Sequence, residues 1–196
     1  MTKLKEKILL GTQQILVGNG FEGTDIDSVL RQARINKGTF YSVFKTKDEL
    51  LNAIIEFESA KLFSKLDELF SSSFNPLSTL NAFLDWKLKN FNTNSNMLAK
   101  FGSEFVAREI QLKKKIKKIY GDYTSYIVSL LEAAVENGQL NASTPVRELA
   151  NFIVFSLEGG RMSVDLTSSK DQFADVTNMI KRVIRTYRNL DDITVA

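Results

Sequence analysis

Residues 24–50 read TDIDSVLRQARINKGTFYSVFKTKDEL, and this stretch decides how the N-terminal part of the chain folds. Its apolar residues follow helical spacing in two short runs, which the turn Arg34-Ile35-Asn36 separates. The window 31–47 contains no acidic residue, and its basic residues are Arg31, Arg34, Lys37, Lys45 and Lys47. Two short helices joined by a tight turn, with positive charge on the second, are typical of a helix-turn-helix that enters the major groove of DNA.

The composition favours an all-α protein that stays in solution. Only two prolines and ten glycines occur in 196 residues, so long stretches are free of helix breakers. The net charge of +3 is too small to indicate nucleic-acid binding by itself, and the local clustering of basic residues carries that argument. No apolar run is long enough to cross a membrane, and the first residues do not form a signal peptide. We therefore expect a soluble, cytoplasmic protein with no membrane partner.

The residue types that are missing argue against an enzyme. The sequence contains no histidine and no cysteine, which removes the commonest general base, the thiol nucleophile and the usual zinc ligands. It also lacks a glycine-rich phosphate loop and a nucleophile elbow. Carboxylate chemistry remains formally open, but no paired motif supports it. We predict no catalytic residue, no cofactor and no metal site.

Helical periodicity predicts nine helices and no strand along the chain. Thr24 is expected to cap the second helix, Thr46 and Glu49 to form a capping box, and Gly138 to end the long seventh helix. The helices whose bounds the sequence suggests are 2–18, a pair within 24–44, 47–69, 76–91, 97–107, 109–137, 146–166 and 171–187. We predict a helix-turn-helix DNA-binding domain over 1–46 and a ligand-binding and dimerisation domain over 47–196.

The stretch 24–50 also resembles the DNA-binding signature of the tetracycline-repressor (TetR) family of bacterial regulators. The run KGTFYxxF, followed by a lysine and an acidic pair, matches at both polar and apolar positions. The resembling residues are Thr24, Ile26, Val29, Ala33, Ile35, Lys37 to Tyr41, Phe44, Lys47, Glu49 and Leu50. Beyond residue 50 the likeness rests on Glu104 and on the run Leu157-Glu158-Gly159-Gly160. The resemblance implies three small helices followed by a six-helix bundle, in a homodimeric repressor or activator whose DNA affinity changes with a small molecule.

The chemistry of individual residues supports a DNA contact surface. Thr24 could offer its hydroxyl to a phosphate, Lys37 could donate to base edges at the start of the second helix, and Gly38 could let the backbone approach DNA closely. Three of the candidate residues also have an interpretation without DNA. Thr24 can be a helix cap alone, Lys37 can be a solvated lysine, and Tyr41 can be a core residue. Arg34 stands where the family usually has glycine, so a left-handed backbone there would be strained. The predicted DNA-contacting residues are Thr24, Arg34, Lys37, Gly38, Thr39, Tyr41 and Lys47.

The predicted bundle is rich in aromatic residues, which favours an apolar or aromatic effector bound inside it. The alternative is that these rings simply fill a helical core. The predicted ligand-binding residues are Leu62, Leu66, Phe83, Trp86, Phe101, Phe105, Tyr123, Ile127 and Phe155. The basic run Lys113 to Lys118 is expected to be a solvated face that could add non-specific attraction to DNA.

The last two helices are predicted to form a dimer interface. An apolar stripe repeats along the ninth helix, and the pair Gly159-Gly160 would allow another helix to approach closely; the same stripe could also be intramolecular core. The predicted interface residues are Phe152, Gly159, Gly160, Phe173, Val176, Ile180, Val183, Ile184 and Tyr187. Two copies would place recognition helices in major grooves roughly 34–36 Å apart, or a multiple of that, which requires a near-palindromic operator.

The sequence thus predicts a DNA-binding transcriptional repressor that a small molecule releases from its operator. The effector would prefer a spacing of the paired DNA-binding heads that does not fit the operator. The alternative is a helical ligand-binding or interaction protein that has lost specific DNA binding, and the retained KGTFY run argues against it.

Overall fold

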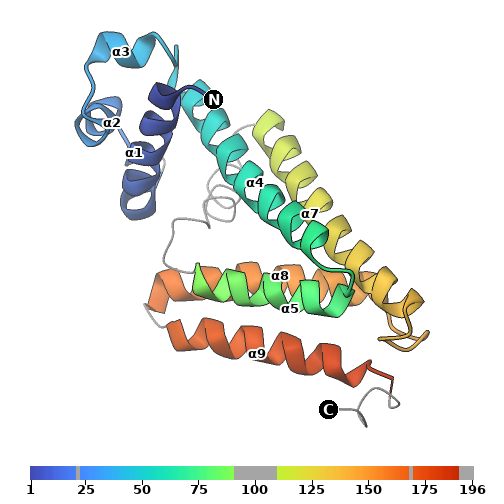
Figure 1. Cartoon of the computed structure of the whole chain (residues 1–196). Helices are drawn as coiled ribbons and strands as arrows, with labels where there is room; N and C mark the ends of the chain where they lie inside the picture. The colour runs from blue at the N-terminus through green and yellow to red at the C-terminus, as the bar shows by residue number, and fades with distance from the viewer. Residues whose placement is uncertain (21–22, 91–109, 168–169, 190–196) are drawn as a thin grey trace. The chain divides into compact units, whose positions relative to one another are not determined.

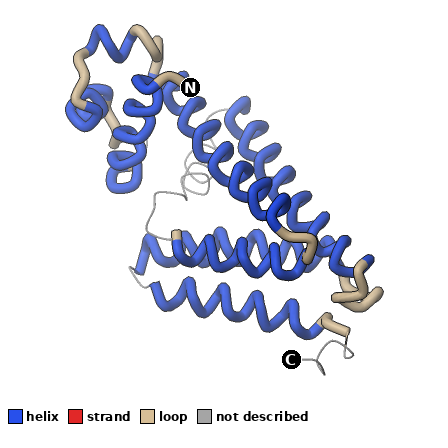
Figure 2. Tube along the Cα trace, in the orientation of Figure 1, coloured by secondary structure: helices blue, strands red, loops and turns tan. Residues whose placement is uncertain are grey.

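The structure is a computed structural model that describes residues 1–20, 23–90, 110–167 and 170–189, and in these residues the backbone is helical between short loops (Figures 1 and 2). The only strand-like pairing among them is an isolated bridge between Leu140 and Arg188. The helices are α1 (Lys3–Asn19), α2 (Ile26–Ala33), α3 (Lys37–Tyr41), α4 (Lys47–Ser72), α5 (Pro76–Lys89), α7 (Ile110–Glu136), α8 (Val146–Thr167) and α9 (Lys170–Thr186). The all-α prediction is confirmed.

Most predicted helix bounds agree with the observed ones to within a few residues. Gly20 follows α1 with a φ of 64° and Gly138 follows α7 with a φ of 71°, so glycines end both helices as expected. Asn75 caps α5 by accepting a hydrogen bond from the backbone N–H of Ser78 at 2.9 Å. The predicted helix over 97–107 lies outside the described residues, so the total of nine remains a prediction.

The described residues form two compact units. The first unit contains residues 1–62 together with the start of α7 as far as Lys117. The second contains α4 from Phe63 onward, α5, the rest of α7 from Lys118, α8 and α9. The helices α4 and α7 therefore contribute residues to both units. The predicted domain boundary between residues 46 and 47 is not tested by this division and stays a prediction.

In the first unit, α1 packs against α2 and α2 against α3. A Cβ atom added to Gly11 of α1 would lie 3.2 Å from the backbone and side chain of Ala33 in α2. Glycine at this crossing lets the two helices approach closely. Ile8, Leu9, Val29 and Phe40 are buried around it, so α1 fixes the position of the α2–α3 pair.

In the second unit, α9 packs against α8 and α5, which run beside it in Figure 1. The core consists of apolar side chains from α5, α7, α8 and α9 that are nearly or fully buried. Its largest buried residues include Leu80, Phe83, Tyr123, Ile127, Ile153 and Phe173. No described helix combines the length and the apolar character that a membrane span needs.

Candidate nucleic-acid interface

The turn between α2 and α3 has the left-handed backbone that the sequence suggested. Arg34 has φ 50° and ψ 56°, and it is the one non-glycine residue of the described chain with positive φ. Its backbone N–H donates to the carbonyl of Arg31 at 3.2 Å, and the N–H of Ile35 donates to that of Leu30 at 3.1 Å. These bonds close the end of α2 and turn the chain toward α3. The Arg34 side chain is exposed.

The helix α3 begins at an asparagine cap. The side chain of Asn36 accepts a hydrogen bond from the backbone N–H of Thr39 at 2.8 Å. Phe40 is fully buried and its ring lies 5.9 Å from that of Phe44. With Phe40 anchored inside, Lys37 and Gly38 are exposed, which leaves the start of α3 accessible as predicted.

The glycine at position 38 is not required by the protein's own packing. A Cβ atom there would meet only the Asn36 side-chain oxygen, at an ordinary 3.5 Å, and the backbone is helical with no positive φ. Glycine in a helix costs roughly 1 kcal/mol relative to alanine. The packing of the described residues therefore gives no reason for a glycine at this position.

The charge of Arg31 helps to lower the pKa of the Asp25 carboxyl, but the basic residues beside the turn are otherwise without ion pairs in the described part of the chain. Arg31, Arg34 and Lys37 form no ion pair with any residue that the structure describes. Arg31 donates to the hydroxyl of Ser28 at 2.8 Å, and Lys45 donates to the backbone carbonyl of Tyr41 at 2.9 Å. A shallow hollow of about 560 Å³ opens beside the turn, lined by Leu30, Arg31, Arg34, Ile35, Asn36 and Thr39.

The predicted cap at Thr24 is wrong. Asp25 caps α2, accepting from the backbone N–H of Ser28 at 2.6 Å, and this bond is the main cause of a lowered pKa of the Asp25 carboxyl. Thr24 is buried, and its hydroxyl donates to the carbonyl of Gly20 at 2.6 Å. Threonine and aspartate both cap helices well, and burial of the threonine decides between them. No exposed hydroxyl remains at Thr24 for a phosphate.

The start of α4 carries the predicted reciprocal cap, with one difference. The Thr46 hydroxyl accepts from the backbone N–H of Glu49 at 3.1 Å. The Glu49 carboxylate accepts from the N–H of Lys45 at 2.7 Å, one residue earlier than the usual capping box. Lys47 is the first residue of α4 and is half-buried, as is Tyr41 in α3.

The predicted ligand-binding residues differ in burial and do not line one common site among the described residues. Leu62, Leu66, Phe83, Tyr123 and Ile127 are buried, Trp86 is half-buried, Phe155 is exposed, and Phe101 and Phe105 lie outside the described residues. Three of them do meet in the second unit. The Phe83 ring stacks on Trp86 at 5.9 Å and meets the edge of Tyr123 at 5.8 Å.

A polar cluster adjoins these rings, and sequence reasoning missed it. The Lys87 ammonium lies 3.4 Å from the Glu158 carboxylate, and both side chains are about 15% exposed, at 15% and 14%. The Tyr120 hydroxyl donates to the same carboxylate at 3.1 Å. Burial, then the Glu158 charge, raises the pKa of Tyr120 and of Tyr123 well above the ordinary value of 10.0, so both phenols stay protonated. We call Lys87, Tyr120, Tyr123 and Glu158 the Lys87–Glu158 cluster.

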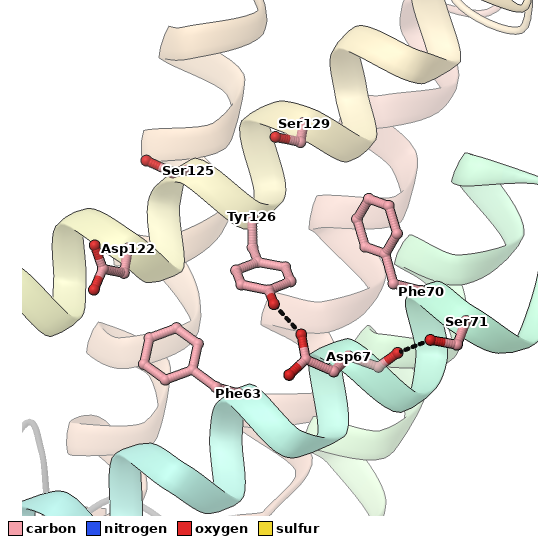
Figure 3. A pocket seen from close by; sticks show the side chains of 8 residues that line it. All are labelled: Phe63, Asp67, Phe70, Ser71, Asp122, Ser125, Tyr126 and Ser129. Carbon is pink, nitrogen blue, oxygen red and sulfur yellow. Dashed lines mark hydrogen bonds between the residues drawn. The ribbon is translucent and has the colours of Figure 1, made fainter.

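A separate open groove lies between α4 and α7 in the second unit (Figure 3). It encloses about 800 Å³ and is lined by Phe63, Asp67, Phe70, Ser71, Asp122, Ser125, Tyr126 and Ser129. The Tyr126 hydroxyl donates to Asp67, and Phe63 and Phe70 flank the Tyr126 ring. None of the predicted ligand-binding residues that the structure describes lines this groove.

The predicted dimer residues divide into two groups. Phe173, Ile180 and Ile184 are buried inside the second unit, which favours the intramolecular interpretation of the α9 stripe. Val176 and Phe173 also lie 3.1 to 3.3 Å from the position of a Cβ on Gly160, so α9 of the same chain explains that glycine. Val183 and Tyr187 are half-buried.

The other face of α8 is apolar and uncovered. Phe152, Phe155 and Met162 are 39%, 63% and 42% exposed, and a Cβ on Gly159 would meet no atom within 4 Å. These four residues, which we call the α8 stripe, repeat at intervals of three and four and so share one side of the helix. Met162 is a member that sequence reasoning missed, although its helical spacing from Phe155 was a usable signal.

Two known families match most of the chain. Residues 8–54 match "Bacterial regulatory proteins, tetR family", and residues 78–180 match "Tetracyclin repressor-like, C-terminal domain", which covers more than half of the 196 residues. The chain belongs to the TetR family. Like the other proteins of this family, it is a DNA-binding transcriptional regulator.

Individual TetR-family proteins support this assignment. The chain is 28% identical over 138 residues to an uncharacterised helix-turn-helix regulator from the lacX 3′ region of Lactococcus lactis, a match that spans 66% of this chain and 68% of the relative. It is 22% identical over 188 residues to the transcriptional repressor NemR of Escherichia coli, covering 93% and 94% of the two chains.

Solved TetR-family structures have the same fold. A regulatory protein from Rhodobacter sphaeroides superposes with a TM-score of 0.83 at 21% identity, over 92% of this chain and 98% of that one. Reduced NemR of E. coli gives a TM-score of 0.80 at 20% identity, over 92% and 96%. The agreement places α2 and α3 as the helix-turn-helix of the TetR fold.

Proposed function

We propose that this regulator is a repressor that binds a near-palindromic operator as a homodimer and is released by a small apolar molecule. The observation that carries the proposal is the start of α3, where an exposed lysine and a glycine that no described contact requires lie next to the exposed Arg34, and neither basic residue forms an ion pair with a described residue. The DNA contacts come from Arg34, Lys37, Gly38, Thr39 and Tyr41, with Lys47 at the start of α4. Thr24 contributes through its packing and not through its hydroxyl.

The α8 stripe supports the homodimer. Its exposed phenylalanines are unusual for a surface helix, and an open glycine between Phe155 and Met162 leaves room for a second helix to cross at close range. A two-fold pairing along α8 buries the stripe of each copy against the other. Phe152 and Gly159 thus keep their predicted role, while Gly160 and the buried α9 residues belong to the core.

The effector site lies in the second unit, beside the contacting rings of Phe83, Trp86 and Tyr123. Because α4 and α7 contribute to both units, a change in their packing in the second unit is transmitted along the same helices to the first. The effector shifts the population toward the dimer that does not fit the operator, to the extent that it binds that state more tightly.

The proposal is tested by a gel-shift titration with the DNA that flanks the protein's own gene, comparing wild type with Gly38→Ala. The added methyl fits the protein, so thermal stability stays equal or rises. Against DNA, however, the methyl overpacks a close contact, which costs about 1–3 kcal/mol, so operator affinity falls about tenfold or more. Gly121→Ala is the matched control, because Gly121 is also helical, exposed and open around its Cβ.

Two outcomes would contradict this function. Unchanged operator affinity in Gly38→Ala would remove α3 from the DNA interface. Absence of any specific shift by the wild type at moderate salt would favour the alternative, a helical ligand-binding protein that has lost DNA recognition. The proposal includes no catalytic role, and it places the protein in the cytoplasm, where a bacterial operator is.

A further inference from the structure

The hydroxyl of Tyr123 has no hydrogen-bond partner among the residues that the structure describes. The side chain is 1% exposed, and its oxygen is one of the few buried polar atoms of the described residues left unpaired. A buried polar group without a partner costs free energy, so native proteins normally satisfy it. Tyr123 is also in contact with Phe83 and lies close enough to Glu158 for that charge to affect its pKa.

Several N–H and O–H donors of the Lys87–Glu158 cluster are left without a partner among the described residues. The Glu158 carboxylate accepts from Lys87 and from Tyr120. Lys87 carries three N–H donors and uses one of them there; its ammonium otherwise faces the rings of Phe83 and Tyr123, at 5.7 and 5.2 Å. The Tyr123 hydroxyl stays protonated and donates to no described residue. A hydrogen-bond acceptor would satisfy the Tyr123 hydroxyl and the remaining N–H donors of Lys87.

The charges of Lys87 and Glu158 limit which kind of hydrogen-bond acceptor suits the site. Lys87 and Glu158 already form an ion pair, so their charges cancel. A carboxylate ligand would bring a second negative charge beside Glu158 in a partly buried site, where like charges repel strongly. A carbonyl oxygen accepts hydrogen bonds and adds no net charge. The neighbouring Phe83 and Trp86 rings suit an apolar or aromatic body.

We propose that the effector is a neutral molecule with an apolar, ring-sized body and a carbonyl-type oxygen that accepts the Tyr123 hydroxyl. This inference rests on the proposed function, since it names the chemical class that the effector site of the second unit takes. Lys87 and Tyr120 hold Glu158 in place, and Tyr123 makes the new hydrogen bond.

The test uses the full chain and three probes of similar size: acetophenone, ethylbenzene and benzoate. Trp86 is the only tryptophan of the sequence and stacks on Phe83, so quenching of its fluorescence reports binding beside Tyr123. Free tryptophan titrated in parallel corrects for absorbance by the probes. Wild type should bind acetophenone about tenfold more tightly than ethylbenzene, the effect of one buried hydrogen bond, and more tightly than benzoate.

The decisive variant is Tyr123→Phe, which removes one oxygen and keeps the ring. It should bind acetophenone and ethylbenzene alike. Its thermal stability without a probe should equal or exceed that of wild type, because the lost hydroxyl was unpaired. Tyr126→Phe is the matched control on the same helix: its hydroxyl contacts Asp67 in the groove of Figure 3, and its probe preference should be that of wild type.

A preference for acetophenone that survives in Tyr123→Phe would overturn the inference, as would a complete lack of Trp86 quenching by all three probes. A clear drop in the stability of probe-free Tyr123→Phe would also overturn it, because the hydroxyl would then have a structural partner such as a water molecule. The gel-shift titration of the same wild-type preparation separates these failures from failure of the DNA-binding function.

Discussion

Glu58 is a carboxylate that α4 carries into the interior of the first unit. It is 4% exposed, and within the described residues it pairs with Lys61 at 3.1 Å, a side chain that is itself 43% exposed. Burial raises the pKa of Glu58 above its ordinary value of 4.5, and the Lys61 charge opposes this only in part. A raised carboxyl pKa means that the folded state holds the proton more tightly than the unfolded state does.

From this we predict a pH-dependent effect of Glu58→Gln. At neutral pH the folded wild type bears the cost of a buried charge, so the variant should melt at a higher temperature. As the pH falls through the folded-state pKa and below 4.5, both states of the wild type become protonated and the advantage should disappear. Thermal unfolding followed by circular dichroism across this range measures it.

The control for this prediction is Glu68→Gln, on the same helix. Glu68 is 65% exposed and pairs with Lys65, so its replacement should change the melting temperature little at any pH. A Glu58→Gln advantage of the same size at acidic and neutral pH would contradict the assigned cause.

Single residues show where sequence reasoning works and where it stops. The left-handed backbone of Arg34 could be predicted, because the family that the stretch resembles usually has glycine at this position. The cap of α2 could not, because Thr24 and Asp25 are adjacent and both suit that position. Burial chose between them, and burial depends on the packing of α1 and α2.

At the scale of the element, α8 has two apolar faces with different purposes. Ile153, Val154 and Leu157 are buried inside the second unit. The α8 stripe, on the remaining side, is exposed and centred on Phe155. A helix that is apolar on both sides needs a second partner, and the described chain does not supply one for the stripe.

We predict that Phe155→Glu weakens the homodimer. A charge placed at the centre of a helix–helix contact should raise the dimer dissociation constant about thirtyfold or more, the ~2 kcal/mol typical of a buried interface aromatic. The monomer should stay folded, because Phe155 is 63% exposed in it. Sedimentation velocity over a range of concentrations measures the equilibrium.

The matched control is Phe74→Glu, at a fully exposed phenylalanine in the connection between α4 and α5. It introduces the same charge outside the stripe and should leave the oligomeric state alone. Equal behaviour of the two variants would count against the stripe as the dimer seam.

The elements of the bundle were predictable from periodicity, but their partners were not. The stripe on α9 has helical spacing that suits a dimer seam and a core equally, and its packing on α8 and α5 settles the matter for Phe173 and Ile180. The same limit applies to the aromatic residues. An aromatic residue has the same spacing in the sequence whether its ring fills the core or lines a binding site. Only the structure shows that the Tyr123 hydroxyl is unpaired among the described residues.

At the scale of the whole molecule, α4 and α7 each contribute residues to both compact units, and the proposed coupling of effector and DNA binding relies on this continuity. Lys115 of α7 contacts Glu56 of α4 at 2.6 Å within the first unit, and Tyr126 contacts Asp67 within the second. The helix-turn-helix signature identified the family from the sequence because its contacts are local. The sequence also predicted that an effector changes the spacing of the DNA-binding heads, and this stays a prediction; the contacts between α4 and α7 could not be predicted, because they join residues far apart in the chain.

The open surroundings of Gly159 have a consequence for covalent chemistry. A residue on a two-fold axis faces its own copy, and this sequence contains no cysteine, so Gly159→Cys would carry a single thiol per chain. If the α8 helices cross at this point, mild oxidation should join the two chains through a disulfide, which a non-reducing gel would detect; Gly121→Cys should stay unlinked. Failure of Gly159→Cys to link in a proven dimer would move the symmetry axis along α8. If the disulfide-linked dimer still binds its operator and is still released by the effector, then the DNA-binding domains change their spacing while the contact between the two α8 helices stays in place.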